Sequence, residues 1–459
     1  MSARPPEGPS AAGTGLPVAE LDLTSFDGRV RMRQFVARPD RYRHLEMVAP
    51  DRLRITRGGG YSYAAAGFGA TASLVQDGRA FDRVLSFDED TGVLECEAGT
   101  TLGKIHDVAF PRGWYLPVQP GYPHITVGGC IAADVHGKNQ FADGNFHGVV
   151  LGLRLFHPRH GTLDLDARRE PEVFDLTCGG FGLTGHILSA RLRLSRLPGT
   201  RVRVRRVAVP RFEETMGLLE SHAPQSTFIY TWHDFTASGD GFGRGFLYAG
   251  EFVSGSPAEG HSQPRIVEID SETRGRWRAP FFNGFTTRAF NAAYYRTQGW
   301  GPESRELGLF PFLFPVARKV VYFELFGTRG FREHQVLIPR DRFASLASSL
   351  RDYLGRRPTP VTLASCKLFR GVPKYLRFDG DGLCLAVDVP EGPDGERLSV
   401  FLDGLVRDLG GRPNIIKDSR LPREIAQACY PEYDAFRDGL RRFDPQRLFA
   451  SELSERLGL

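Results

Sequence analysis

Glycine, small apolar residues and polar side chains come together between Gly121 and Asn139 (GYPHITVGGCIAADVHGKN). Four glycines and the small residues from Cys130 to Ala133 let a backbone come close to a large planar ligand. Apolar residues recur every fourth position between 127 and 135, which predicts a short helix whose glycine-rich N-terminus faces an anion such as a pyrophosphate. His136 and Lys138 follow directly and bring proton-transfer and charge-stabilising chemistry to the same place.

Two further glycine clusters flank this stretch. One is Arg57-Gly58-Gly59-Gly60-Tyr61-Ser62-Tyr63 and the other spans residues 179–185 (GGFGLTG). Taken alone, each cluster is more readily explained as a tight turn, because glycine is the usual residue of strained loops. Neither a GxGxxG fingerprint between a strand and a helix nor a Walker loop is present. We therefore expect a nucleotide held by several separate loops.

Lysines elsewhere could remove a hydroxyl proton or stabilise a developing alkoxide. Lys367 lies in an apolar run, so we expect a buried strand in which the ammonium needs a partner. Two isoleucines precede Lys417 and predict a strand end that delivers this side chain toward the site. The charged residues after Lys417 fit an exposed turn equally well, and His136 also fits a structural histidine bonded to backbone.

The secondary structure that must position these residues is predicted to differ between the two halves of the chain. Short apolar runs broken by turn residues predict strands as far as Leu197, with hairpins around residues 88–92 and 158–161 and a helix within 98–114. Beyond residue 200 the segments are longer and rich in aromatic residues. Helical patterns there cover residues 341–355, 401–414 and 425–457, with breaks at proline and glycine.

Length and charge bound the class of protein. A chain of 459 residues predicts two or three domains. Its 59 basic and 54 acidic residues are interspersed and give a net charge of +5, which argues against a nucleic-acid arm but suits an anionic cofactor or phosphorylated substrate. No apolar run has the length of a membrane span and no signal peptide is recognisable, so we expect a soluble, cytoplasmic protein. Six scattered cysteines without CxxC indicate buried thiols rather than disulfides or a metal site.

The order of these motifs resembles the flavoproteins of the vanillyl-alcohol-oxidase type. The resemblance implies an α+β fold in which an FAD-binding domain is split around an inserted substrate domain built on an antiparallel sheet. The corresponding segments are a disordered leader (1–17), the first part of the FAD-binding domain (18–200), the substrate domain (201–411) and a C-terminal segment that completes the site (412–459). Tyr61 stands where such proteins often carry the histidine that links to the flavin. The resemblance therefore implies FAD held noncovalently.

Within this superfamily the chain resembles in particular the family of the oxidative subunit of decaprenylphosphoryl-β-D-ribose 2′-epimerase. The shared signatures are TVGGCIAADVHGKN, GGFGLTG, CKLF, VDVP, IIKDSR and DPQRLFAS. The resemblance implies that Lys417 lies nearest the reacting carbon, with His136 and Lys138 as further catalytic groups. The implied FAD contacts, besides residues 57–62, are Tyr63, Pro120, Gly121, Thr126, Gly128, Gly129, Ala133, His136, Gly144 and Ile187. The implied substrate contacts are Tyr63, His136, Lys138, Trp232, Gln335, Lys367 and Lys417.

Some positions depart from that family's pattern. Cys384 and Ala386 occupy the positions of an asparagine and a cysteine, Glu333 stands in place of a glutamine, and Asn414 in place of an aromatic residue. An acid that replaces an amide changes which polar groups a pocket accepts. These departures indicate a substrate that differs from the family's.

The sequence therefore predicts an FAD-dependent oxidoreductase. We expect it to oxidise a secondary hydroxyl of a sugar or ribosyl-type substrate to a ketone by hydride transfer to flavin N5, with a reductase as the partner that acts on the keto product. An aldonolactone oxidase of the same superfamily and a catalytically silent flavin-binding protein are the alternatives. The combination of Lys417, His136 and Lys138 argues against the silent protein, because binding FAD alone does not need all three.

Overall fold

The N-terminal part of the computed structural model builds a small mixed sheet. The structure describes residues 15–255, 280–315 and 320–459, so most of the expected leader lies outside the described residues. The first two strands pair antiparallel, whereas the second, third and fourth strands in the sheet order run parallel to one another. The sheet order is β1 (Val18–Thr24), β2 (Arg31–Ala37), β4 (Leu74–Asp77) and β3 (Arg54–Arg57), with α1 (Tyr42–Glu46) after β2.

A second, five-stranded sheet is antiparallel throughout. Its order is β5 (Val84–Asp88), β6 (Val93–Glu97), β10 (His186–Arg193), β8 (Val150–His157) and β9 (Gly161–Leu165). The two hairpins predicted around residues 88–92 and 158–161 are confirmed as β5–β6 and β8–β9. A separate two-stranded antiparallel sheet pairs β7 (Trp114–Tyr115) with β11 (Ser195–Arg196).

Two capped helices bring the glycine-rich stretch against this second sheet. The helix expected within 98–114 is α2 (Leu102–Ala109), and the one expected between 127 and 135 is α3 (Val127–Ala133). Thr101 and Thr126 are their N-caps, and each side chain accepts a backbone N–H of the first turn. The left-handed Asp134 (φ 44°) ends α3. The short helices α4 (Gln140–Asp143) and α5 (Pro171–Thr177) follow.

The middle of the chain forms an eight-stranded antiparallel sheet, as expected for this region. It reaches from residue 201 to residue 413, two residues beyond the expected boundary at 411. The sheet order is β15 (Ser304–Gly308), β12 (Arg201–Val209), β14 (Gly245–Phe252), β13 (Phe228–His233), β17 (Leu363–Phe369), β18 (Gly382–Pro390), β16 (Phe331–Ile338) and β19 (Arg412–Pro413).

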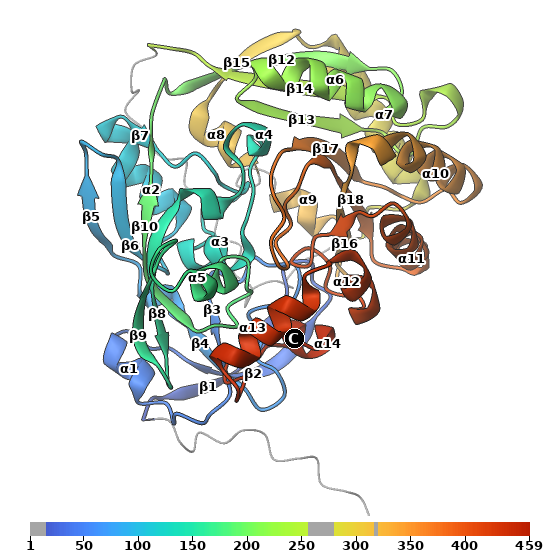
Figure 1. Cartoon of the computed structure of the whole chain (residues 1–459). Coiled ribbons are helices and arrows are strands. Elements are labelled where there is room, and N and C mark those ends of the chain that lie inside the picture. Colours follow the sequence, from blue (N-terminus) through green and yellow to red (C-terminus); the bar gives the residue numbers. More distant parts are fainter. Residues whose placement is uncertain (1–14, 256–279, 316–319) are drawn as a thin grey trace, which may run out of the picture.

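Helices cover this large sheet (Figure 1). The apolar stripes of α10 (Phe343–Arg356) and α11 (Pro393–Asp408) join the core that contains Val336 and Val387 of the strands. The pattern read at 341–355 is confirmed as α10, whereas α11 begins eight residues before the pattern read at 401–414 and ends before the glycines at 410 and 411. The other helices of this part are α6 (Thr215–His222), α7 (Gly284–Trp300), α8 (Leu309–Leu313) and α9 (Val320–Glu324).

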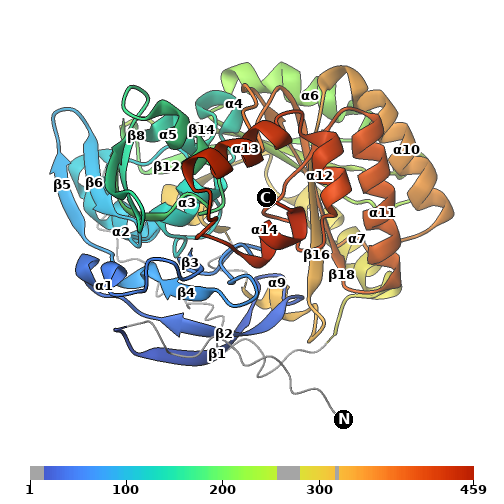
Figure 2. The ribbon, with the colours of Figure 1, turned by 60° about the horizontal axis from the view of Figure 1, so that its bottom comes forward.

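The C-terminal segment returns to the N-terminal sheet between its last two helices (Figure 2). Its helices are α12 (Arg423–Cys429), α13 (Tyr433–Phe443) and α14 (Glu452–Leu457), which confirms the helical pattern predicted for 425–457. Between α13 and α14, Phe449 pairs with Arg54 and Ser451 with Gly69. The chain end thus closes against the loop that follows β3. Within the described ranges, no helix is both long and apolar enough to cross a membrane.

A substitution of Phe212 can test the packing of the core under the large sheet. The ring of Phe212 is fully buried and packs against the rings of His233, Phe235 and Phe343. We expect Phe212→Ala to lower the free energy of unfolding by about 3–5 kcal/mol, measured by urea denaturation, because a large cavity is left. Phe285→Ala is the matched control, since Phe285 is 81% exposed and should change stability by less than about 0.5 kcal/mol. Equal effects at the two positions would contradict this packing.

Candidate active site

Three separate loops and the C-terminal return enclose one large cavity. It contains about 1240 Å³ of space, counting the part open to solvent. Its walls come from residues 56–68, from residues 120–135 on and before α3, from residues 181–187 before and in β10, and from Ile416 and Lys417. The three glycine clusters recognised in the sequence therefore line a common space.

Glycine is required where the first two loops meet. A Cβ on Gly58 would collide with Oγ1 of Thr126, the N-cap of α3, and one on Gly59 would lie 2.9 Å from the carbonyl oxygen of His124. A Cβ on Gly128 would lie 3.0 Å from that of Ala98. The glycines thus let α3 and the 57–63 loop approach closely enough to form one continuous wall.

The charge of the lining suits an anionic ligand. Arg57 and Lys417 line the cavity, and none of the lining residues, all within the described ranges, is acidic. His186 also lines it, but burial lowers the pKa of its imidazole to about 4, so it is neutral near pH 7. The ring of His186 instead lies 2.9 Å, through Nδ1, from Oγ1 of Thr56.

The cavity includes most of the cofactor residues expected from the sequence. Of that set, only Gly121, His136 and Gly144 are not among its lining residues. Residues that the sequence did not single out also line it. Phe181, Gly182 and Gly185 belong to the third glycine cluster, Ile125 to the central stretch and Ile416 to IIKDSR. No pattern marked the remaining lining residues Thr56, Ala64, Ala66, Gly67, Phe68, Gly78, Ala98, Gly99 and His186.

The strands β16, β17 and β18 carry a row of polar side chains on one face. Side chains alternate between the two faces of a strand, and the register pairs Glu333 with Asp388 and Lys367 with Cys384. These residues share a face opposite to Val336 and Val387, which pack on α10 and α11. β13 pairs with β17 through His233 and Ala364, so the same alternation places Trp232 on the face that carries Lys367. The members of this polar face are Trp232, Glu333, Gln335, Lys367, Cys384 and Asp388.

Lys417 lies between the cavity and the polar face. Its Nζ is 3.3 Å from Oε1 of Glu333 and 3.7 Å from the centre of the Tyr63 ring. The expected strand end before Lys417 is wrong, because the ladder stops at Pro413 and residues 415–417 form a turn. Oδ1 of Asn414 accepts the backbone N–H of Ile416, and its carbonyl accepts that of Lys417, so a local turn outweighs the preference of two isoleucines for a strand.

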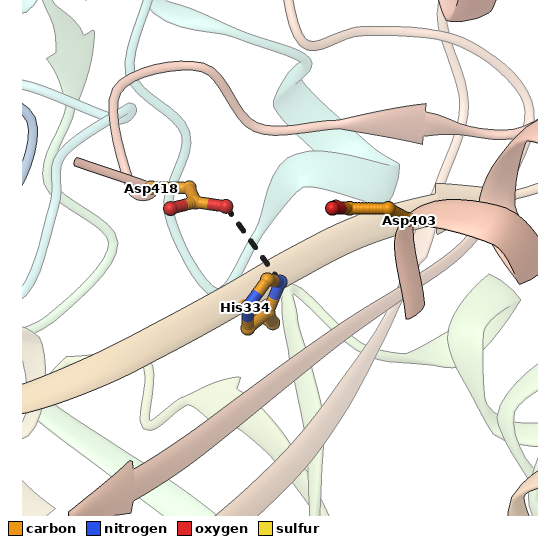
Figure 3. Close-up of side chains that lie close together, drawn as sticks. All are labelled: His334, Asp403 and Asp418. Atoms are coloured by element: carbon orange, nitrogen blue, oxygen red, sulfur yellow. Dashed lines mark ion pairs between the residues drawn. The ribbon is translucent and has the colours of Figure 1, made fainter. Parts of the chain in front are cut away.

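A buried ion network holds this turn from the other side of the sheet (Figure 3). Arg420 donates to both carboxylate oxygens of Asp403 at 2.8 and 3.0 Å, and it also lies 3.1 Å from Asp418. His334 lies 3.9 Å from Asp418 and 2.6 Å from the hydroxyl of Ser399. Arg420 already supplies the positive charge that this pair of acids needs, so the cluster is an anchor for the segment that carries Lys417.

His136 and Gln335 form a second polar contact near Lys417. Oε1 of Gln335 accepts the side-chain amide of Asn414 at 2.5 Å and lies 3.4 Å from Nε2 of His136. Burial, and then the positive charge of Lys367, hold the pKa of His136 well below its usual value. His136 is therefore a neutral hydrogen-bonding group. The sequence left open a functional role and a structural role for His136. The contacts are consistent with both, because Nε2 faces Gln335 and Nδ1 lies 3.5 Å from the backbone carbonyl oxygen of Gly137.

The other expected substrate residues differ in whether their side chains lie near Lys417. Lys367 is partly buried, and burial followed by the nearby charge of Lys417 lowers the pKa of its ammonium. Lys138 points elsewhere, because its Nζ donates to the carbonyl of Phe312 and lies 4.3 Å from the centre of that ring. Trp232 is buried, with its ring centre 4.6 Å from that of Tyr294.

Sequence reasoning missed two residues beside Glu333. Asp388 is 1% exposed and accepts a hydrogen bond at 3.0 Å from the hydroxyl of Tyr322. Burial and the adjacent carboxylate of Glu333 raise the pKa of Asp388 well above its usual value. The signal was the aspartate of VDVP within an apolar strand, where a buried acid needs an explanation. Nothing in the sequence indicated Tyr322.

Comparison with known proteins identifies the cofactor. Residues 49–165 match the FAD binding domain family, and these residues supply two of the three cavity loops. The cavity fits FAD, because glycine loops form its walls and its charged lining is purely cationic.

Relatives with described activities extend the likeness. Decaprenylphosphoryl-beta-D-ribose oxidase of Mycolicibacterium smegmatis is 29% identical over 90% of this chain and 93% of its own. D-arabinono-1,4-lactone oxidase of Candida glabrata is 24% identical over 46% of this chain and 43% of its own. Mitochondrial D-2-hydroxyglutarate dehydrogenase of Arabidopsis thaliana is 32% identical over 21% of this chain and 18% of its own.

The cavity leads to a prediction about how FAD is held. Tyr61 lines the wall in place of a linking histidine, and none of the six cysteines lines it. We expect trichloroacetic acid precipitation of the holoprotein to release all of the flavin into the supernatant, as measured by its absorbance. A yellow protein pellet would show a covalent bond and contradict the prediction.

Cys384 provides a second test, because it lies on the polar face beside Lys367. Burial raises the pKa of its thiol to about 12, so the thiolate is scarce at neutral pH. We expect Cys384→Ser to keep more than about half of the rate of flavin reduction, since hydride transfer needs no covalent intermediate. A loss of about a thousandfold, which corresponds to about 4 kcal/mol, would instead make Cys384 part of the chemistry.

Proposed function

We propose that the chain, which is an FAD-dependent oxidoreductase of the vanillyl-alcohol-oxidase type, oxidises a secondary hydroxyl of a sugar or ribosyl-type substrate to a ketone. The observation that carries the proposal is the position of Lys417, which lines the FAD cavity and also contacts Glu333 of the polar face. A substrate placed on the polar face would have its reacting carbon next to both the cofactor and this ammonium.

When bound, FAD supplies the acceptor for the hydride that leaves the substrate carbon. The protein must then remove the hydroxyl proton and stabilise negative charge on the oxygen. Lys417 is suited to both tasks, because it faces the cavity and has a carboxylate partner for its proton. Lys367 adds a second cation, and the neutral His136 and the amide of Gln335 offer hydrogen bonds that orient a sugar.

The substrate class rests on the relatives and on the polar face together. The relative that covers nearly the whole chain is named as an oxidase of a ribose derivative. Cationic and hydrogen-bonding side chains on the polar face suit hydroxyl groups and a phosphate of such a molecule. Glu333 and Ala386 differ from the amide and the cysteine expected in that family, so we propose a related but different sugar.

The arrangement of domains belongs to the same proposal. We propose a split FAD-binding domain (18–200) around a substrate domain (201–411), with residues 412–459 completing the site. The antiparallel sheet of residues 201–413 and the pairing of Phe449 with Arg54 support this division. A keto product would then be passed to a partner reductase.

Anaerobic reduction of the bound flavin tests the substrate class. Three probes represent the relatives: an alkylphosphoryl-β-D-ribofuranose, an aldono-1,4-lactone and D-2-hydroxyglutarate. We expect the ribofuranose to bleach the flavin absorbance fastest. Faster bleaching by the lactone would favour an aldonolactone oxidase, and a flavin that none of the three reduces would contradict the proposal.

The lysine itself gives the next prediction. Lys417→Ala should keep FAD bound while flavin reduction by the ribofuranose slows by about a hundredfold or more in anaerobic stopped-flow, the usual scale for a lost proton-transfer group or charge stabiliser. Lys417→Arg should restore little, because a guanidinium keeps the charge but does not give up its proton.

Lys104→Ala is the matched control, because Lys104 is a surface residue paired with Asp82 outside the cavity. Its rate should equal that of the unmodified protein. A near-normal rate for Lys417→Ala would remove Lys417 from the mechanism and return it to the role of a charged turn.

A further inference from the structure

Two carboxyl groups lie side by side behind Lys417. Glu333 of β16 stands directly opposite Asp388 of β18 in the register of the antiparallel pair. Both side chains are nearly inaccessible, at 8% and 1% exposed. Only Glu333 forms an ion pair with Lys417, at 3.3 Å. The ion pair thus connects the cavity wall to the acid pair on the sheet.

The two acids differ in their surroundings. The hydroxyl of Tyr322 donates to Asp388 at 3.0 Å and lies 2.8 Å from the hydroxyl of Thr362, so Asp388 faces neutral hydroxyl groups. Two adjacent carboxylates cannot both stay ionised in a buried place. Asp388, which is buried and has no ion pair with the ammonium, takes the proton, and the single negative charge stays on Glu333 beside Lys417.

The remaining groups around the ion pair come from four other elements. Tyr63 of the first glycine loop places its ring against the ammonium, and Lys367 of β17 adds a like charge. Cys384 of β18 and His136 after α3 are uncharged near neutral pH. Glu333 is therefore the carboxylate that these groups leave available to receive a proton from Lys417.

We propose that Glu333 is the final acceptor of the substrate's hydroxyl proton, which reaches it through Lys417. This inference rests on the proposed oxidation of a hydroxyl. An ammonium has no lone pair, so an ion-paired lysine must first lose a proton in order to act as a base. Glu333 acts on the reacting hydroxyl only through Lys417, which makes it a positioning residue for the proton.

One N–H bond of Lys417 breaks and its proton forms an O–H bond on Glu333, while Nζ takes the proton of the substrate hydroxyl. The C–H bond of the same carbon breaks, its electron pair leaves as a hydride to FAD, and the C=O bond forms. Lys417 ends as an ammonium, Glu333 as a neutral acid, the substrate is oxidised and the cofactor is reduced.

A glutamine at position 333 keeps the size of the side chain but cannot accept a proton, so Glu333→Gln separates this role from packing. In the unmodified protein, flavin reduction by the alkylphosphoryl-β-D-ribofuranose should change little between pH 7 and pH 9, because Glu333 accepts the proton throughout this range. In the Gln variant only a neutral lysine can act as the base. Its rate should be about a hundredfold lower at pH 7 and rise about tenfold per pH unit to at least pH 9.

Glu324→Gln is the matched control, since it removes the same charge from an exposed position on α9. Its pH profile should coincide with that of the unmodified protein. A Gln variant whose rate is unchanged, or is lowered equally at every pH, would overturn the role of Glu333. If the ribofuranose reduces neither the unmodified protein nor the Gln variant, the proposed function fails instead. An NMR titration of Lys417 then still tests the role of Glu333.

The charge of Lys417 can be read without any substrate. The chain has only six lysines, so reductive methylation of the holoprotein with ¹³C-formaldehyde gives few NMR signals, and Lys417→Arg identifies the one from Lys417. Loss of the carboxylate partner should shift the titration of this signal to lower pH by at least one unit in Glu333→Gln and leave it in place in Glu324→Gln. An unchanged titration in Glu333→Gln would overturn the inference.

Discussion

The alternation of side chains along β16, β17 and β18 is the constraint on which the site depends. One face of these strands is apolar except for Arg332 and His334 of β16 and packs on α10 and α11, and the other carries acids, an amide and a lysine. A slip of one residue would exchange the two faces and bury the polar groups in the core. The apolar core therefore fixes the register, and the register places Glu333 opposite Asp388.

The sheet alone does not bring Lys417 to its place. That lysine lies on a turn, and a turn has little packing of its own to hold a side chain. Arg420 binds Asp403 of α11 and Asp418 of the turn, and Ser419 donates to Asp27 at 2.6 Å. Removing one partner of such a buried network leaves an uncompensated charge. The network thus holds the turn between the large sheet and the N-terminal strands.

The sequence was informative where a pattern reflects local physics. Glycine clusters marked the cavity loops because only glycine allows Gly58 and Gly128 to approach their neighbours. Hairpins and helices followed from turn residues and apolar spacing. The turn before Lys417 was missed, because the hydrogen bonds of Asn414 outweighed the strand preference of two isoleucines.

Long-range contacts were beyond the reach of single residues and spacings. Tyr322 and Asp388 are 66 positions apart, and no local pattern relates them. The same holds for Lys138, whose charge looked suitable for the site but which is directed to the carbonyl of Phe312. Only the register of the sheet and the course of the loops decide which charged residues meet.

The pair of acids Glu333 and Asp388 lowers the stability of the folded protein, so its presence needs a functional explanation. Asp388 has a raised pKa in the folded protein, so it takes up a proton on folding at any pH between the ordinary value near 4 and its folded value. Stability therefore falls as the pH rises through that interval, because the unfolded chain binds fewer protons. The raised pKa of this buried acid is therefore a cost to the fold as the pH rises. Groups of this kind gather where a protein needs a proton held at a defined place, and Asp388 keeps Glu333 the charged partner of Lys417.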